Sequence, residues 1–135
     1  MSDTPEFANF DEFWPFYVRE HSSKTNRRLH FVGTSLALGC VATAVVMRKP
    51  LMALAAPVLG YGGAWVGHFF VEKNRPATFK YPLWSLMGDF KMYGMILRGR
   101  MDEEVERVLR DYAAKAAEAE AKTDGAAPPA PAPAN

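Results

Sequence analysis

Residues 29–71 read LHFVGTSLALGCVATAVVMRKPLMALAAPVLGYGGAWVGHFFV, and this stretch decides the fold. Two apolar runs, at about 29–47 and 51–71, flank the short polar break Arg48-Lys49-Pro50. Each run has roughly the ~20 residues that a helix needs to cross the hydrocarbon core of a bilayer. The sequence therefore predicts an all-α integral membrane protein, built on an antiparallel transmembrane helical hairpin with interfacial or re-entrant helices around it.

Polar residues occur at matching depths in the two arms of this hairpin. Counted from Lys49 at the turn, His30 lies nineteen positions before it and His68 nineteen after it. Asn26 lies twenty-three positions before Lys49, and Glu72 lies twenty-three positions after it. Each arm keeps i,i+4 spacing, so on helices packed ~8–10 Å apart the four side chains can converge on one site. Ionisable residues are costly in a membrane and usually functional, which makes this a candidate site.

Small residues share the helix faces that carry the histidines. Gly63 and Gly67 have the small-xxx-small spacing, and Gly33 and Ala37 follow His30 along its own arm. Small side chains let membrane helices approach closely, so we expect this stripe to form the contact between the arms. Under the alternative interpretation, the glycines serve packing and the histidines are hydrogen-bonded interface residues without chemistry.

The composition divides the chain into an apolar middle and polar ends. Although 49% of the residues are hydrophobic, the mean hydropathy is slightly negative. The net charge of +1 gives no indication of a nucleic-acid partner. Cys40 is the only cysteine, which excludes an internal disulfide and a cysteine-based metal site. The acidic start, with no apolar core before Leu29, predicts that there is no cleavable signal peptide.

The segment before the hairpin is rich in aromatic residues. Between residues 7 and 20 they recur at helical spacing, which predicts a short helix. This helix either lies on the membrane surface, as aromatic belts do, or packs against the rest of the protein. His21 follows, nine residues before His30, so a continuous helix would point the two in opposite directions. We therefore expect the helix to break within Ser22-Ser23-Lys24-Thr25, whose side chains can cap a new helix.

The second arm is expected to end before Pro76, because the residue that precedes a proline disfavours helical geometry. Residues 81–97 carry Asp89 and Lys91, which suits a re-entrant or interfacial helix that starts near Pro82. Asp89 then faces either the site or solvent. The predicted organisation has three parts: a membrane-embedded catalytic domain over 1–101, a cytosolic amphipathic helix over 102–122 and a disordered Ala/Pro tail over 123–135. The apolar stripe of the amphipathic helix is expected to contain Met101, Val105, Val108, Leu109 and Tyr112.

Basic residues flank the outer ends of both arms, which predicts that both termini and the site face the cytosol. Arg48 and Lys49 in the turn oppose this orientation. The expected location is a multi-pass membrane protein, in the inner membrane of a bacterium or the endoplasmic reticulum of a eukaryote.

Three motifs together resemble a known family: His21-x4-Asn26-Arg27-x2-His30-x2-Gly33, Gly67-His68-x3-Glu72-x-Asn74-x-Pro76-Ala77 and Pro82-x2-Ser85-Leu86-x2-Asp89. Over about residues 7–101 the chain resembles the small membrane-protein family typified by the iron-dependent 2-hydroxy fatty acid dioxygenase of phytosphingosine breakdown. The resemblance implies Fe(II)-dependent α-oxidation, in which O2 is used to shorten a 2-hydroxy fatty acid by one carbon.

The resemblance also implies a site, because all three histidines of the chain fall on its motif positions. His21, His30 and His68 are expected to bind one Fe2+ ion, and imidazole is a good ligand for ferrous iron. A site with two histidines and Glu72 is the alternative ligand set. Iron-bound histidines need acceptors on their other ring nitrogens, and Glu72, Asp89 and Asn26 are the expected acceptors and catalytic residues.

The substrate is expected to lie beside the iron, with its acyl tail in the bilayer or between the helices. Arg27, Arg75 and Asn74 are the predicted substrate-binding residues, since a guanidinium pairs well with a carboxylate. A non-catalytic membrane protein, whose polar cluster only pairs helices or binds lipid, is the alternative function. Haem binding through His30 and His68 is disfavoured, because haem does not need the nearby acids and amide. The oligomeric state is not predicted.

Overall fold

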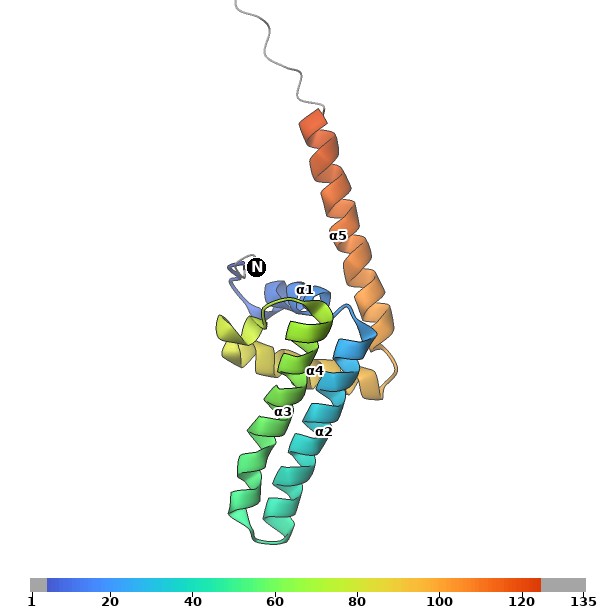
Figure 1. Cartoon of the computed structure of the whole chain (residues 1–135). Coiled ribbons are helices and arrows are strands. Elements are labelled where there is room, and N and C mark those ends of the chain that lie inside the picture. The colour runs from blue at the N-terminus through green and yellow to red at the C-terminus, as the bar shows by residue number, and fades with distance from the viewer. Residues whose placement is uncertain (1–4, 125–135) are drawn as a thin grey trace, which may run out of the picture.

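The computed structural model describes residues 5–124, and none of these residues lies in a strand. The predicted all-helical fold is therefore confirmed. The first arm of the hairpin is α2 (Lys24–Val46). The second arm is continuous in space but built from η1 (Pro50–Leu54), α3 (Ala55–Val66) and η2 (Gly67–Glu72). The two arms lie side by side and antiparallel, joined by the predicted tight turn (Figure 1).

Small residues bring the backbones of the two arms into contact, as predicted. A Cβ atom on Gly63 would lie 2.8 Å from the carbonyl oxygen of Leu29. A Cβ atom on Gly67 would overlap the side chain of Asn26. A larger residue at Gly63 would have to displace backbone, and one at Gly67 would have to displace the buried side chain of Asn26. This close approach sets the distance between the histidine-bearing faces.

The second arm ends in an unusual turn. The segment η2 is a π-helix, a wider coil that is rare and often occurs at functional sites. It stops at Lys73, which adopts a left-handed conformation with φ of 56°, and the amide of Asn74 then donates to the carbonyl of His68 at 3.0 Å. The helix thus ends at Glu72, a few residues before Pro76, and the turn folds Asn74 back toward His68.

The remaining helices form a cap over the open end of the hairpin. They are α1 (Phe10–Glu20), η3 (Ala77–Phe79), α4 (Pro82–Leu97) and the start of α5 (Met101–Asp124). Figure 1 shows α1 and α4 running across the hairpin, while α5 extends away on the side opposite the turn. The helix α4 begins at Pro82 as expected. The hairpin and the cap thus meet where the polar residues of both arms lie.

A hydrophobic core holds the cap together. The aromatic helix α1 lies inside it, so the structure supports the packing alternative for this helix. At the core's edge the indole of Trp14 donates to Glu104 at 2.8 Å, which ties α1 to α5. The buried core side chains are Phe13, Trp14, Phe16, Tyr17, Val18, Ala77, Met92, Met101, Val105 and Val108.

The stripe predicted on the last helix is confirmed in part. Met101, Val105 and Val108 are buried and Tyr112 is partly buried, but Leu109 is 41% exposed. Leu109 is about 100° around the helix from Val108 and so points beside the core. The helix α5 continues to Asp124, two residues into the segment predicted as tail, and the rest of that prediction lies outside the described residues.

The outer half of the hairpin presents an apolar surface to its surroundings. Both arms are long and apolar enough to cross a membrane, yet only 17% of each candidate span is buried within the protein. Helices in the core of a soluble protein are mostly buried, and large exposed apolar patches mark interaction with lipid or protein. The side chains that face outward near the turn include Val45, Val46, Leu51, Leu54 and Val58.

Candidate metal centre

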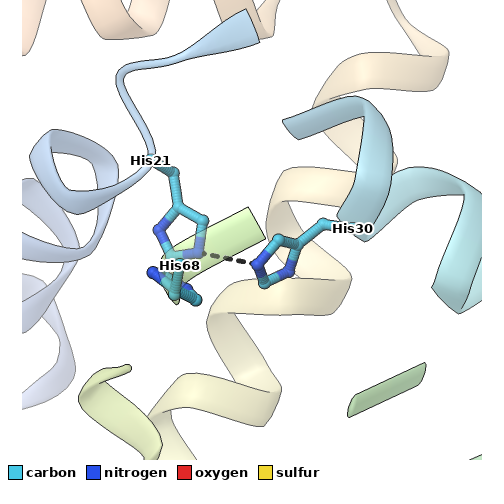
Figure 2. Close-up of side chains that lie close together, drawn as sticks. All are labelled: His21, His30 and His68. Atoms are coloured by element: carbon cyan, nitrogen blue, oxygen red, sulfur yellow. Dashed lines mark hydrogen bonds between the residues drawn. The ribbon is translucent and has the colours of Figure 1, made fainter. Parts of the chain in front are cut away.

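Three elements each bring one histidine to the junction of hairpin and cap. His21 follows the last turn of α1, His30 lies on α2 and His68 lies on η2, and all three are buried. Their ring centroids are 4.5–5.2 Å apart (Figure 2). The helix break expected before Lys24 allows His21 to join the other two. The structure thus brings the three predicted histidines together, and the arms place His30 and His68 at the same depth.

The Nδ1 atom of each ring faces a hydrogen-bond acceptor. His21 Nδ1 lies 2.6 Å from the backbone oxygen of Tyr17, and His30 Nδ1 lies 3.2 Å from Oδ1 of Asp89. Because these acceptors require a hydrogen on Nδ1, both rings are assigned the tautomer whose Nε2 carries the free lone pair. Asp89 therefore points toward the cluster rather than toward solvent, and a carboxylate in this position can orient a histidine that binds a metal.

His68 is oriented by a short relay of side chains. Its Nδ1 atom lies 2.8 Å from Oδ1 of Asn74. The amide nitrogen of Asn74 donates to the backbone oxygen and the carboxylate of Glu20, at 3.0 and 2.8 Å. These two acceptors fix which end of the amide faces the histidine. Glu20 was not predicted as part of the site, because its place depends on how α1 packs against the hairpin.

Tyr17 supports the site through both its backbone and its hydroxyl group, although it was not among the residues predicted for the site. Its hydroxyl donates to Oδ1 of Asp89 at 2.5 Å, and its ring stacks on His21 at 4.0 Å. Burial, followed by the charge of Asp89, raises the pKa of Tyr17 and keeps it protonated as a donor. The spacing did contain a signal, since Tyr17 precedes His21 by four residues and its carbonyl is the i−4 acceptor at a helix end.

One ring nitrogen of each histidine belongs to a single cluster of possible metal ligands. Donor nitrogens of the three rings all lie within 4.8 Å of one another, and His21 Nε2 is 3.2 Å from His30 Nε2. Two nitrogens that bind one metal at about 2.1 Å lie about 3.0–3.4 Å apart, and the His21–His30 pair has this spacing. Burial lowers the pKa of His21, which favours the neutral form that binds metals. Figure 2 marks the contact between the two Nε2 atoms as a hydrogen bond, which requires a hydrogen on one of them. With the hydrogens on Nδ1, the two Nε2 lone pairs face each other instead, and a bound cation would relieve their repulsion.

A small cavity adjoins the histidines. Its volume is about 20 Å³, and Tyr17, Ser85 and Asp89 contribute to its walls together with the three rings. The hydroxyl of Ser85 is buried and has no hydrogen-bond partner within the described part of the chain. An orphaned buried hydroxyl at a cavity of this size fits a bound ion or small ligand, and the donor set fits a metal.

The sequence model of one protein family, described as 2-hydroxy-palmitic acid dioxygenase Mpo1-like, matches residues 7–101. The chain belongs to the Mpo1-like family. The predicted resemblance is confirmed over the same residues, and the Mpo1-like match includes the three histidines and the partners of their rings. No curated protein matches the chain, and neither does any solved structure.

In this Mpo1-like chain, Glu72 and Asn26 meet across the hairpin but lie outside the histidine cluster. Glu72 Oε1 accepts from the amide of Ser23 at 2.6 Å and from the side chain of Asn26 at 3.5 Å. This places the carboxylate at the N-terminus of α2, where a negative charge is stabilised. The geometry thus associates Glu72 with the start of a helix, whereas the cluster of candidate ligands contains only the three histidines.

The three predicted substrate-binding residues are engaged in different ways. Arg27 is buried, donates to the backbone oxygens of His21 and Ser22, and binds Asp102 at 2.7 Å. Asn74 orients His68, as described above. Arg75 is exposed and lies over the ring of Phe79, 5.1 Å from its centroid. Arg27 and Asn74 therefore position the histidine-bearing segments of this Mpo1-like site, and a substrate contact of any of the three stays a prediction.

Proposed function

We propose that the protein is an Fe(II)-dependent dioxygenase that shortens 2-hydroxy fatty acids by one carbon. The observation that carries the proposal is the cluster of three buried imidazoles, each of which has its Nδ1 atom beside an acceptor. The family description names a dioxygenase and 2-hydroxy-palmitic acid, which supports the reaction class and the substrate class.

The chemistry of the donor set supports iron. Imidazole suits ferrous iron, and non-haem sites that activate oxygen leave coordination positions open. A ferrous ion bound by the three histidines would supply the activation of O2 and of the hydroxy acid. The protein's own groups then have separate tasks: Asp89, Asn74 and the Tyr17 carbonyl fix the rings, and burial excludes water. The hydroxyl of Ser85 offers a hydrogen bond to whatever occupies the small cavity.

The non-catalytic alternative fits the geometry less well. A polar cluster that only pairs helices is stable when its members satisfy one another's hydrogen bonds. Here the Nδ1 atoms of His21 and His30 both face acceptors, so with one hydrogen on each ring the 3.2 Å contact between their Nε2 atoms has no donor. The Ser85 hydroxyl also has no partner among the described residues. Haem is disfavoured more strongly, because a cavity of about 20 Å³ has no room for a porphyrin.

We also infer that the hairpin crosses a membrane with both termini in the cytosol, in the inner membrane of a bacterium or the endoplasmic reticulum of a eukaryote. The exposed apolar outer half and the span-length arms support the insertion. A helix of 23 residues is about 34 Å long, which exceeds the ~30 Å hydrocarbon core. The histidines then lie near the cytosolic face, where a carboxylate headgroup can reach them from the interface.

The test of the reaction uses the purified full-length protein in detergent, loaded with Fe(II) without oxygen. After O2 and 2-hydroxypalmitic acid are added, mass spectrometry should detect the acid that is one carbon shorter. Palmitic acid without the hydroxyl, and protein loaded with Zn(II), are the controls that should give no product. A folded, iron-loaded protein that leaves the hydroxy acid unchanged would refute the proposed reaction.

A further inference from the structure

A second and larger cavity opens from the metal centre along the hairpin. It has a volume of about 300 Å³ and lies between α2, α3 and α4. His30, Asp89 and Tyr61 line both this groove and the small cavity at the histidines, so the two adjoin. From there the groove runs along both arms toward the hairpin turn, as far as Val41 and Ala56.

The lining of the groove is polar at one end only. His30 and Asp89 form the end at the metal centre, and the hydroxyls of Thr34 and Tyr61 come next. Beyond them the walls are apolar and reach Val41, and no described residue of the groove's far half carries a charge. A ligand that matches this pattern has one polar headgroup and a long apolar tail.

The dimensions of the groove suit a single hydrocarbon chain. Along α2 it extends from His30 to Val41, and eleven residues of helix span about 16 Å. Its middle is bordered by Ala37 and Gly60, whose small size leaves room in the groove beside α4. Its volume is at the lower end of the range for ligand pockets, about 300–1,000 Å³. A flat or branched lipid fits such a groove less well than a straight acyl chain.

The groove is open toward the surface that the proposed membrane would cover. Leu38, Val41 and Phe90 on its rim are 42–49% exposed. A chain entering from the bilayer could slide in sideways without passing through water.

We infer that this groove holds the acyl chain of the substrate, with its headgroup at the histidine end, and that Val41 and Ala56 limit the chain length. The inference rests on the proposed function for the identity of the headgroup. The groove itself is formed by α2, α3 and α4, so it should bind a saturated fatty acid in the absence of metal. The acyl tail was expected to lie either in the bilayer or between the helices, and this groove favours the space between the helices.

The first experiment measures binding of saturated fatty acids of increasing length to the metal-free full-length protein, by displacement of a fluorescent fatty acid. The Val41→Trp variant fills the far end of the groove and should bind only chains several carbons shorter than the wild type binds. Leu36→Trp is the matched control, because Leu36 is on the same helix, is 50% exposed and does not line the groove. Equal length limits in Val41→Trp and the wild type would overturn the inference.

The second experiment needs no substitution and so does not depend on the folding of a variant. A saturated fatty acid with a photoreactive diazirine on its terminal carbon is bound to the wild-type protein and irradiated. Peptide mapping should find the label near Val41 or Ala56. Labelling confined to the outward surface around Val46 and Leu51 would show that the tail lies in the lipid, and would overturn the inference.

These outcomes are independent of the reaction test. Label at Val41 in a protein that gives no shortened product would support the groove and refute the proposed chemistry. If instead the protein gives the shortened product, but Val41→Trp and the wild type bind chains of the same maximum length, the proposed chemistry is supported and the groove is refuted.

Discussion

The ring of each histidine in the cluster is oriented by a different kind of hydrogen-bond acceptor beside its Nδ1 atom. His21 uses a backbone carbonyl, which no side-chain substitution removes, whereas His30 and His68 use Asp89 and Asn74. Asp89 and Asn74 can therefore be mutated without changing a candidate ligand. Loss of such a hydrogen-bond partner typically weakens metal binding by about 10–100-fold, far less than the loss of a ligand does.

Asp89→Ala and Asn74→Ala should each weaken iron binding by about 10–100-fold, while His68→Ala should abolish it. Titration against a competing chelator measures the three affinities. Glu72→Gln is the control, because this carboxylate contacts the Ser23 amide rather than a ring nitrogen. If folded Glu72→Gln lost iron as completely as His68→Ala, Glu72 would be a ligand and the three-histidine set would be wrong.

The part of the candidate site that lies on the two arms of the hairpin was largely predictable from the sequence. The equal spacing of His30 and His68 from the turn predicted that they lie at the same depth, and the motif pattern added His21 and Asp89. Tyr17 and Glu20 were not predicted, because their contacts arise from the packing of α1 against other elements. Arg27 was predicted to bind substrate, yet its guanidinium is held by the loop that carries His21.

At the scale of the elements, the close contact of the two arms determines whether the histidines can meet. Gly63→Ala places a methyl group 2.8 Å from the backbone oxygen of Leu29, which can move only if the helices separate. We expect a loss of about 1–3 kcal/mol in unfolding free energy, as for other overpacked contacts. Thermal or denaturant unfolding in detergent measures the loss.

The neighbouring Gly62 provides a matched control for this prediction. A Cβ atom on Gly62 meets no atom within 4 Å, so Gly62→Ala should be neutral or stabilise the helix by up to about 1 kcal/mol. Equal destabilisation by the two substitutions would contradict the proposed role of close helix contact.

A salt bridge joins α5 to the start of the hairpin and should make stability depend on pH. Lys24, and then Arg27, lower the pKa of Asp102 through hydrogen bonds. A depressed folded pKa gives stability that is present above the unfolded pKa of about 4 and is lost as pH falls through the folded value. Asp102→Asn should therefore be less stable than the wild type near neutral pH, by up to about 1 kcal/mol, since Asp102 is half exposed.

The wild type and Asp102→Asn should converge in stability as the pH is lowered below about 4, because the protonated carboxyl resembles the amide. Unfolding curves of both proteins across this range provide the measurement. A difference that persists unchanged into acid would mean that the charge of Asp102 is not what holds α5.

The elements themselves were predicted to different degrees. Apolar run length located both arms of the hairpin within a few residues, and Pro82 located the start of α4. The aromatic spacing of α1 gave a helix but could not decide between membrane surface and core, because both environments favour the same residues. The π-helical turn at His68 and the left-handed Lys73 depend on tertiary contacts that no local pattern records.

At the scale of the whole molecule, the aromatic helix of the cap and the outer half of the hairpin differ in exposure. The helix α1 buries Phe13, Trp14, Phe16 and Tyr17, whereas the outer half of the hairpin exposes its apolar side chains. The only cysteine of the chain, Cys40, lies in the middle of α2 and can report on the environment of the hairpin. In sealed vesicles it should resist a membrane-impermeant maleimide and should react after denaturation.

The orientation is tested by moving the cysteine. In a Cys40→Ser background, Lys49→Cys at the hairpin turn should react only from the non-cytosolic side and Lys115→Cys on α5 only from the cytosolic side. Reaction of both from one side would show that the hairpin does not cross the membrane. Reaction of each from the reverse side would place the site away from the cytosol.

The central claim is that His21, His30 and His68 bind one iron ion through their Nε2 atoms. Elemental analysis of the purified wild type and of the three single alanine variants, each shown to be folded by circular dichroism, tests this claim most directly. We expect about one iron per chain in the wild type and almost none in any of the three variants, since each removes one ligand of the set. Full iron occupancy in a folded His21→Ala, His30→Ala or His68→Ala protein would contradict it.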